Sequence, residues 1–162
     1  MAELDRLPPR FPQVFVSFCK EELGGNFVTH LVWAMRESGI NVLIDSYNRR
    51  GIEDGKQQVF TCIEKSNIAL AIFSKWYSES DLYLNELAKM EELAKEGKLV
   101  VIPVFYNVKT NEVRRLQGEF EIHFADSVKR FSMEPVMVQN WGEALNFIIK
   151  RSTGLSLERH RY

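Results

Sequence analysis

Two uninterrupted apolar runs constrain the fold of this 162-residue chain more than any other feature. One reads Ile-Ala-Leu-Ala-Ile-Phe at residues 68–73, and the other reads Leu-Val-Val-Ile-Pro-Val-Phe at residues 99–105. A strand with one solvated face alternates apolar and polar residues, whereas a strand covered on both faces is apolar throughout. The two runs therefore predict a parallel sheet with helices on each side.

The remaining segments alternate between strand and helix patterns. Apolar residues recur at helical spacing after Asn26, a suitable N-cap, and Gly39 ends that pattern. Residues 45–56 are polar, contain two glycines and are expected to form a long loop, and Gly118 lies in a polar connector that carries a short helix. Further strands are expected at residues 14–18, 41–44 and 136–138, and further helices at residues 60–66, 82–96 and 141–149.

This order of elements predicts one α/β domain of the flavodoxin-like type, with a five-stranded parallel sheet and helices on both faces. We expect the domain to span residues 12–153. Residues 1–11 are expected to form an N-terminal tail, and residues 154–162 a C-terminal tail or the start of a linker.

Composition narrows the classes of partner and compartment. A formal net charge of −1 argues against nucleic acid, and the longest apolar run is far shorter than the ~20 residues of a membrane span. Cys19 and Cys62 fit neither a disulfide framework nor a metal-ligand spacing, and the charged N-terminus is unlike a signal peptide. We therefore expect a cytoplasmic protein, with the nucleus as a second compartment, that binds no metal and no membrane.

The topology also predicts where a ligand binds. In the flavodoxin-like order, the switch point lies between the first and third strands, outside their carboxyl ends. Those strands are expected to end at Phe18 and Phe73. The loops at residues 19–25 and 74–81, and the helix that begins near Leu82, should therefore border the pocket.

Glu86 is an unusual residue on that helix. A helical projection places it among Leu82, Met90 and Leu93, inside the apolar arc. A carboxylate on a buried face is costly unless something compensates it, so Glu86 is a candidate functional residue. The alternative is a structural glutamate near the helix start, stabilised by the helix dipole and a water molecule. The other charged residues of the helix project outside the arc: Lys89, Glu91, Glu92, Lys95 and Glu96.

From about residue 14 to residue 149, the chain resembles plant Toll/interleukin receptor (TIR) domains. The most specific stretch is Val-Ile-Pro-Val-Phe-Tyr at residues 101–106, and Leu84-Asn85-Glu86-Leu87 matches the family's Leu-x-Glu-Leu. Weaker matches keep the family's order and spacing: Phe15-Val16-Ser17-Phe18, Leu43-Ile44-Asp45, Arg50-Gly51, Ile63-Glu64-Lys65-Ser66, Phe73-Ser74-Lys75, Tyr77, Val108, Val113-Arg114, Gly118-x-Phe120 and Trp141 with Ala144-Leu145.

The resemblance implies an enzyme that cleaves NAD⁺ between nicotinamide and ribose, giving ADP-ribose or its cyclic forms, in plant innate immune signalling. Glu86 falls on the family's catalytic glutamate. NAD⁺ is then a substrate, and no bound cofactor or metal is expected. The residues expected to contact the substrate are Ser17, Phe18, Lys20, Asp45, Arg50, Ser74, Leu82 and Tyr83.

The resemblance further implies association with itself and with other TIR domains. The family uses a Ser-His pair on its first helix, and Thr29-His30 occupies that position here. The alternative for His30 is a solvated surface histidine. Arg49-Arg50 lies in the loop that moves in the family when domains pack side by side.

Two departures from the family weaken the expected catalysis. The first loop usually reads Arg-Gly-Glu-Asp-Thr-Arg, whereas residues 19–24 here read Cys-Lys-Glu-Glu-Leu-Gly, without either arginine. The family's Trp-Cys before Leu-x-Glu is replaced by Leu82-Tyr83. A non-catalytic scaffold or decoy that binds other TIR domains is therefore the alternative function. A response regulator is disfavoured because no acidic pair follows the first strand.

Overall fold

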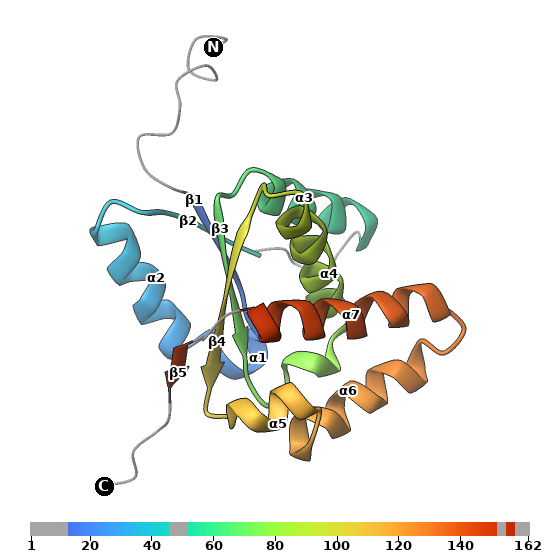
Figure 1. Cartoon of the computed structure of the whole chain (residues 1–162). Helices are drawn as coiled ribbons and strands as arrows, with labels where there is room; N and C mark the ends of the chain where they lie inside the picture. The colour runs from blue at the N-terminus through green and yellow to red at the C-terminus, as the bar shows by residue number, and fades with distance from the viewer. Residues whose placement is uncertain (1–12, 46–51, 152–154, 158–162) are drawn as a thin grey trace, which may run out of the picture.

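The structure, a computed structural model, describes residues 13–45, 52–151 and 155–157 (Figure 1). Strands and helices alternate along this part of the chain, as the sequence predicts. In chain order the elements are β1 (Gln13–Ser17), α1 (Lys20–Leu23), α2 (Phe27–Glu37), β2 (Asn41–Ile44), α3 (Ile52–Glu64), β3 (Ile68–Phe73), the 3-10 helix η2 (Tyr77–Glu79), α4 (Asp81–Lys95), β4 (Val100–Tyr106), α5 (Thr110–Arg115), α6 (Gly118–Arg130), α7 (Pro135–Arg151) and β5 (Leu155–Leu157).

The strands form one parallel sheet in the order β2-β1-β3-β4-β5. This is the strand order of flavodoxin-like folds, and the predicted fold class is confirmed. β1 and β3 pair along their length, with Val14 opposite Ile68 and Ser17 opposite Ala71. Because all strands are parallel, their carboxyl ends lie at one edge, beside α1 and η2 (Figure 1).

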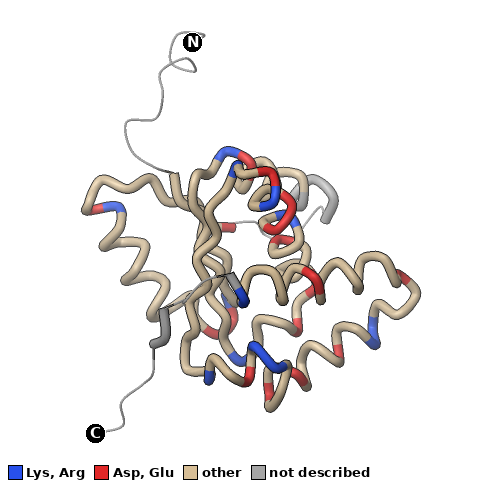
Figure 2. Tube along the Cα trace, in the orientation of Figure 1, with Lys and Arg blue, Asp and Glu red and all other residues tan. Residues whose placement is uncertain are grey.

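Two hydrophobic layers lie on opposite faces of this sheet. On one face Val14, Val16 and Phe18 pack with Val28 and Val32 of α2. The other face, which includes Phe15 and Phe73, is covered by α3, α4 and α7. No described strand contains a charged residue, and Figure 2 shows the charged residues on helices and loops. Burial on both faces is the reason for the uninterrupted apolar runs.

The last strand lies elsewhere than the sequence predicts. Residues 136–138 belong to α7, and β5 is formed by Leu155–Leu157, within the segment assigned to a C-terminal tail. The apolar residues of α7 recur at helical spacing from Met137 and Val138 through Trp141, and Pro135 suits the first position of a helix. The prediction of a strand there was wrong because it relied on three β-forming residues and overlooked the helical spacing that extends beyond them.

The other differences concern loops. α3 begins at Ile52, so its first turn occupies part of the predicted loop at residues 45–56. Residues 46–51 of that loop lie outside the described residues. The polar connector after β4 contains two helices, α5 and the longer α6, rather than one short helix. Gly118 begins α6 with a φ of +68°, a conformation that favours glycine.

The packing of α7 on α4 generates a stability prediction. Trp141 is fully buried, and its indole Nε1 donates a hydrogen bond to Asn85 Oδ1 at 2.9 Å. We expect Trp141→Phe to lower the free energy of unfolding by about 2 kcal/mol, because it removes this bond and leaves a small cavity. Urea denaturation measures the change. Trp33→Phe, at a side chain that is 66% exposed, is the control and should change it by less than about 0.5 kcal/mol. Equal losses would contradict the prediction.

Candidate active site around Glu86

Glu86 is buried where α4 packs against the carboxyl end of β1. It lies in the second turn of α4 and is only 3% exposed. Its Oε2 accepts a hydrogen bond of 2.7 Å from the hydroxyl of Ser17, the last residue of β1. The switch-point argument placed the end of the first strand and the start of this helix at one edge, and the structure brings Ser17 and Glu86 into contact there.

A second hydroxyl extends this network. The phenolic oxygen of Tyr77, a fully buried residue of η2, lies 2.7 Å from Ser17 Oγ and 3.3 Å from the carbonyl oxygen of Tyr83. Sequence reasoning placed Tyr77 within the family resemblance but not in the site. Its position in the loop predicted to flank the pocket, together with a hydroxyl that needs a partner when buried, was the available signal.

The environment of Glu86 strongly favours its neutral form. Desolvation raises the pKa of Glu86 from 4.5 to about 8, and the charge of Asp45 and a hydrogen bond with it act in the same direction. The Ser17 hydrogen bond and the positive charge of Lys20 act in the opposite direction. Lys20 Nζ lies 3.7 Å from Asp45 Oδ1, so these three side chains form one electrostatic unit. Burial, followed by the charge of Glu86, raises the pKa of Tyr77 well above its usual value.

The first loop is held against α4 by Tyr83. The Tyr83 hydroxyl accepts a hydrogen bond from the backbone N–H of Lys20 at 3.1 Å and donates one to Glu21 Oε2 at 3.0 Å. Cys19 Sγ also donates to that carboxylate oxygen, at 3.5 Å. Burial raises the pKa of Cys19 to about 12, so its thiol stays protonated and is not a nucleophile.

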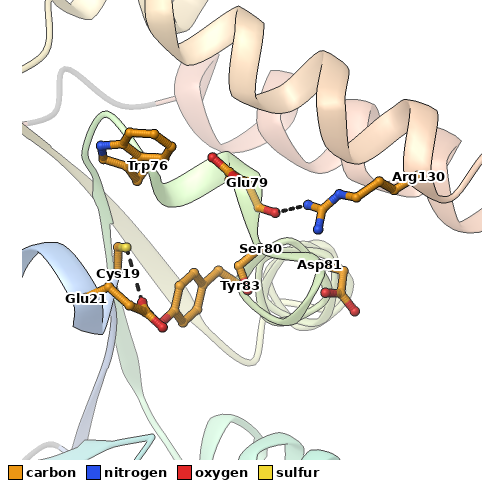
Figure 3. Close-up of a pocket in the computed structure, with 8 residues that line it drawn as sticks. All are labelled: Cys19, Glu21, Trp76, Glu79, Ser80, Asp81, Tyr83 and Arg130. Carbon is orange, nitrogen blue, oxygen red and sulfur yellow. Dashed lines mark hydrogen bonds between the residues drawn. The ribbon is translucent and has the colours of Figure 1, made fainter.

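A pocket of about 310 Å³ opens beside this loop (Figure 3). Tyr83 and Cys19 form part of its lining on one side, and Trp76 and Glu79 border it on another. Arg130 of α6 donates a hydrogen bond to the carbonyl oxygen of Glu79. The complete lining consists of Cys19, Glu21, Trp76, Glu79, Ser80, Asp81, Tyr83 and Arg130.

The predicted site residues divide into three groups. Ser17, Lys20 and Asp45 interact with Glu86, and Tyr83 of α4 binds the backbone N–H of Lys20. Phe18 instead packs in the core beneath α2, since successive strand residues face opposite sides. Buried Ser74 and half-buried Leu82 follow β3, and Arg50 lies outside the described residues.

The candidate residues for self-association, Thr29 and His30, are both exposed on α2. Thr29 Oγ1 donates a hydrogen bond to the carbonyl oxygen of Gly24 at 2.6 Å, which ties this helix to the first loop.

One expectation about α4 was wrong. Glu91 was placed outside the buried arc, but it is only 8% exposed, and its Oε1 lies 3.4 Å from Lys95 Nζ. Both α3 and α7 pack on α4, so the buried face of this helix is wider than its apolar arc. Glu86 is therefore one of two buried carboxylates on α4, and it is distinguished by its contact with the strand edge.

Two features are absent from the part of the chain that the structure describes. None of the helices there is both long and apolar enough to cross a membrane. No group of three or more His, Cys, Asp or Glu side chains in residues 13–45, 52–151 and 155–157 could hold a metal ion.

Known proteins resemble this chain in both sequence and structure. A TIR domain protein of Arabidopsis thaliana is 44% identical over 95% of this chain and 63% of its own length. The disease resistance protein RPS4B of the same plant is 41% identical over 88% of this chain, which spans 12% of that protein. The TIR domains of the activated Roq1 resistosome, which recognises the effector XopQ, superpose with a TM-score of 0.78 at 32% identity, covering 90% of this chain and 87% of theirs.

The family model of the TIR domain matches residues 13–159, nearly the whole chain. Its agreement with the strand order, the Leu-x-Glu-Leu motif on α4 and the relatives above leads to one conclusion. This chain belongs to the TIR domain family.

Proposed function

We propose that this chain cleaves NAD⁺ at the bond between nicotinamide and ribose, with Glu86 as the catalytic carboxylate. The observation that carries the proposal is the burial of Glu86 at the switch-point edge, where Ser17 holds one carboxylate oxygen and Asp45 interacts with the same group. A buried acid with a perturbed pKa at such an edge is typical of a functional residue rather than a structural one.

The reaction needs little machinery from the protein. When the glycosidic C–N bond breaks, its electron pair passes to the pyridinium nitrogen, so nicotinamide leaves as a neutral molecule and no general acid is required. The ribose carbon becomes cationic, as in other glycoside cleavages. An ionised Glu86 beside that carbon stabilises the positive charge. Water or a nucleophile within the ADP-ribose then forms the new bond to that carbon and loses a proton.

The first loop supports weak rather than efficient binding of the substrate. A bidentate arginine holds a pyrophosphate better than the single charge of Lys20, and Glu21 and Glu22 repel it. Arginine also does not fit easily at positions 19 and 24, where the family carries it. Cys19 is buried, and a Cβ added at Gly24 would lie 2.7 Å from the carbonyl oxygen of Lys20.

A non-catalytic scaffold that binds other TIR domains is the second candidate function. It is favoured by the closure of the site, because Glu86 is almost fully buried and does not line the pocket beside it. The domain would then act only by binding other TIR domains through its surface. Nicotinamide release at high protein concentration separates the two functions, since a scaffold releases none.

We also propose that the domain associates with itself through α2. His30 is exposed on this helix next to Thr29, which is anchored within its own chain. The Roq1 relative assembles as a resistosome, which supports association between TIR domains as the mode of action.

The raised pKa of Glu86 predicts a rising pH profile. If the ionised carboxylate is the active form, kcat/KM for nicotinamide release increases with pH up to about 8 and is level above it, with about a tenfold gain per pH unit below 8. Initial rates between pH 6 and 9 measure the profile. Glu86→Gln should release no nicotinamide at any pH. A flat profile in the wild type would exclude ionisation of Glu86 from the mechanism.

The same shift predicts a pH-dependent effect on stability. The folded pKa lies above the unfolded one, so the folded state retains a proton that the unfolded state loses between about pH 4.5 and 8, and stability falls across this range. Glu86→Gln removes that loss, so its melting temperature should exceed the wild-type value by about 10 °C or more at pH 8 and match it at pH 4.5. Exposed Glu92→Gln is the control and should show no such pH dependence.

Self-association is tested on α2. His30→Ala should weaken association by about tenfold, a usual cost for truncating one central interface residue, and lower nicotinamide release in parallel. Light scattering over a concentration series measures the association. Asn140→Ala, at an exposed residue of α7, is the control variant. An unchanged mass distribution for His30→Ala would place the interface elsewhere.

A further inference from the structure

The pocket in Figure 3 ends before it reaches the proposed catalytic carboxylate. Its lining includes Cys19 and Tyr83, but neither Glu86 nor Ser17 contributes to it. Glu86 is 3% and Ser17 is 1% exposed, so solvent in the pocket has no direct route to the carboxylate. Catalysis at Glu86 therefore requires a path between a pocket and a buried group that are separate in this conformation.

Tyr83 lies between the two. Its ring stacks on Tyr77 with centroids 5.6 Å apart and planes inclined by 23°. The hydroxyl of Tyr77 lies 2.7 Å from Ser17 Oγ, which is bonded to Glu86. On the pocket side, Tyr83 itself is part of the lining, although only 2% of its surface is exposed. The contacts from pocket to carboxylate thus run through Tyr83, Tyr77 and Ser17 in that order.

Two polar contacts hold the Tyr83 ring in this position. Its hydroxyl accepts from the Lys20 N–H and donates to the Glu21 carboxylate, which also lines the pocket. Both partners belong to α1, a helix of four residues with few contacts to the rest of the fold. Short elements of this kind open locally at lower free energy than the core does. A movement of α1 therefore removes the polar contacts of Tyr83 without unfolding the sheet.

We propose that Tyr83 determines access to Glu86. In this conformation its side chain closes the path from the pocket to the carboxylate. When the ring moves away from Tyr77, the pocket and Glu86 become connected. The inference rests on the proposed function for the identity of the substrate, NAD⁺, but the closure itself is a property of the fold. It accounts for a buried catalytic carboxylate beside a ready pocket. It also gives a role to position 83, where this chain has tyrosine and the family has cysteine.

Carbodiimide coupling of glycine ethyl ester to carboxylates, followed by peptide mass spectrometry, measures access to Glu86 directly. α4 provides internal standards, because Glu91 is buried away from the pocket and Glu92 is exposed. Removing the ring with Tyr83→Ala should increase the labelling rate of Glu86 about tenfold or more, while the rates of Glu91 and Glu92 stay unchanged. Tyr83→Phe keeps the ring but loses the hydroxyl contacts and should give a smaller increase in the same direction.

If Tyr83→Ala does not fold, Glu21→Gln tests the proposal instead. It weakens the charged hydrogen bond to Tyr83 at a solvent-exposed residue, so an increase in Glu86 labelling is again expected. Unchanged labelling of Glu86 in the folded variants, or a parallel rise at Glu91 that indicates general loosening, would overturn the proposal. Increased labelling without nicotinamide release in any variant would support the closure by Tyr83 and overturn the proposed NAD⁺ cleavage.

Discussion

The structure depends on a sheet whose described strands contain no charged residue and must be covered on both faces. Parallel pairing satisfies the backbone of these strands, but it forces every connection to cross the sheet as a helix. All strand ends then lie at one edge and all the following loops gather there. The contact between Ser17 and Glu86 follows from this geometry, since β1 ends where the second turn of α4 crosses it.

Burial of Glu86 has a cost that its partners only partly offset. One hydroxyl hydrogen bond and one lysine charge favour the carboxylate, whereas desolvation and Asp45 favour the acid, and the second pair prevails near neutral pH. If Glu86 had only a structural role, an uncharged side chain at this buried position would make the fold more stable. The retained acid is therefore consistent with a group whose charge is needed only when a cationic partner is present.

Much of the fold and part of the site could be predicted from the sequence. The apolar run Ile68–Phe73 determined the class of sheet, and the helical periodicity alone singled out Glu86 as a carboxylate on an apolar face. Tyr77 was missed because hydroxyl pairing depends on which rotamers meet across the fold, a matter of tertiary packing. Glu91 was predicted to be exposed because the sequence of α4 alone does not show that two helices, α3 and α7, pack on it. β5 escaped detection because three residues carry no usable period.

Under the proposed function, NAD⁺ would itself complete the electrostatics of this site. Burial, and after it the charge of Asp45 and a hydrogen bond with it, make Glu86 hold a proton that an exposed carboxyl would lose near neutral pH. A pyridinium ribose placed beside Glu86 adds a positive charge at short range, which lowers the pKa of the carboxyl. Binding of NAD⁺ would thus create the ionised form that the reaction requires. Below about pH 8 the empty site would stay neutral, and the charge proposed for catalysis would form when NAD⁺ binds.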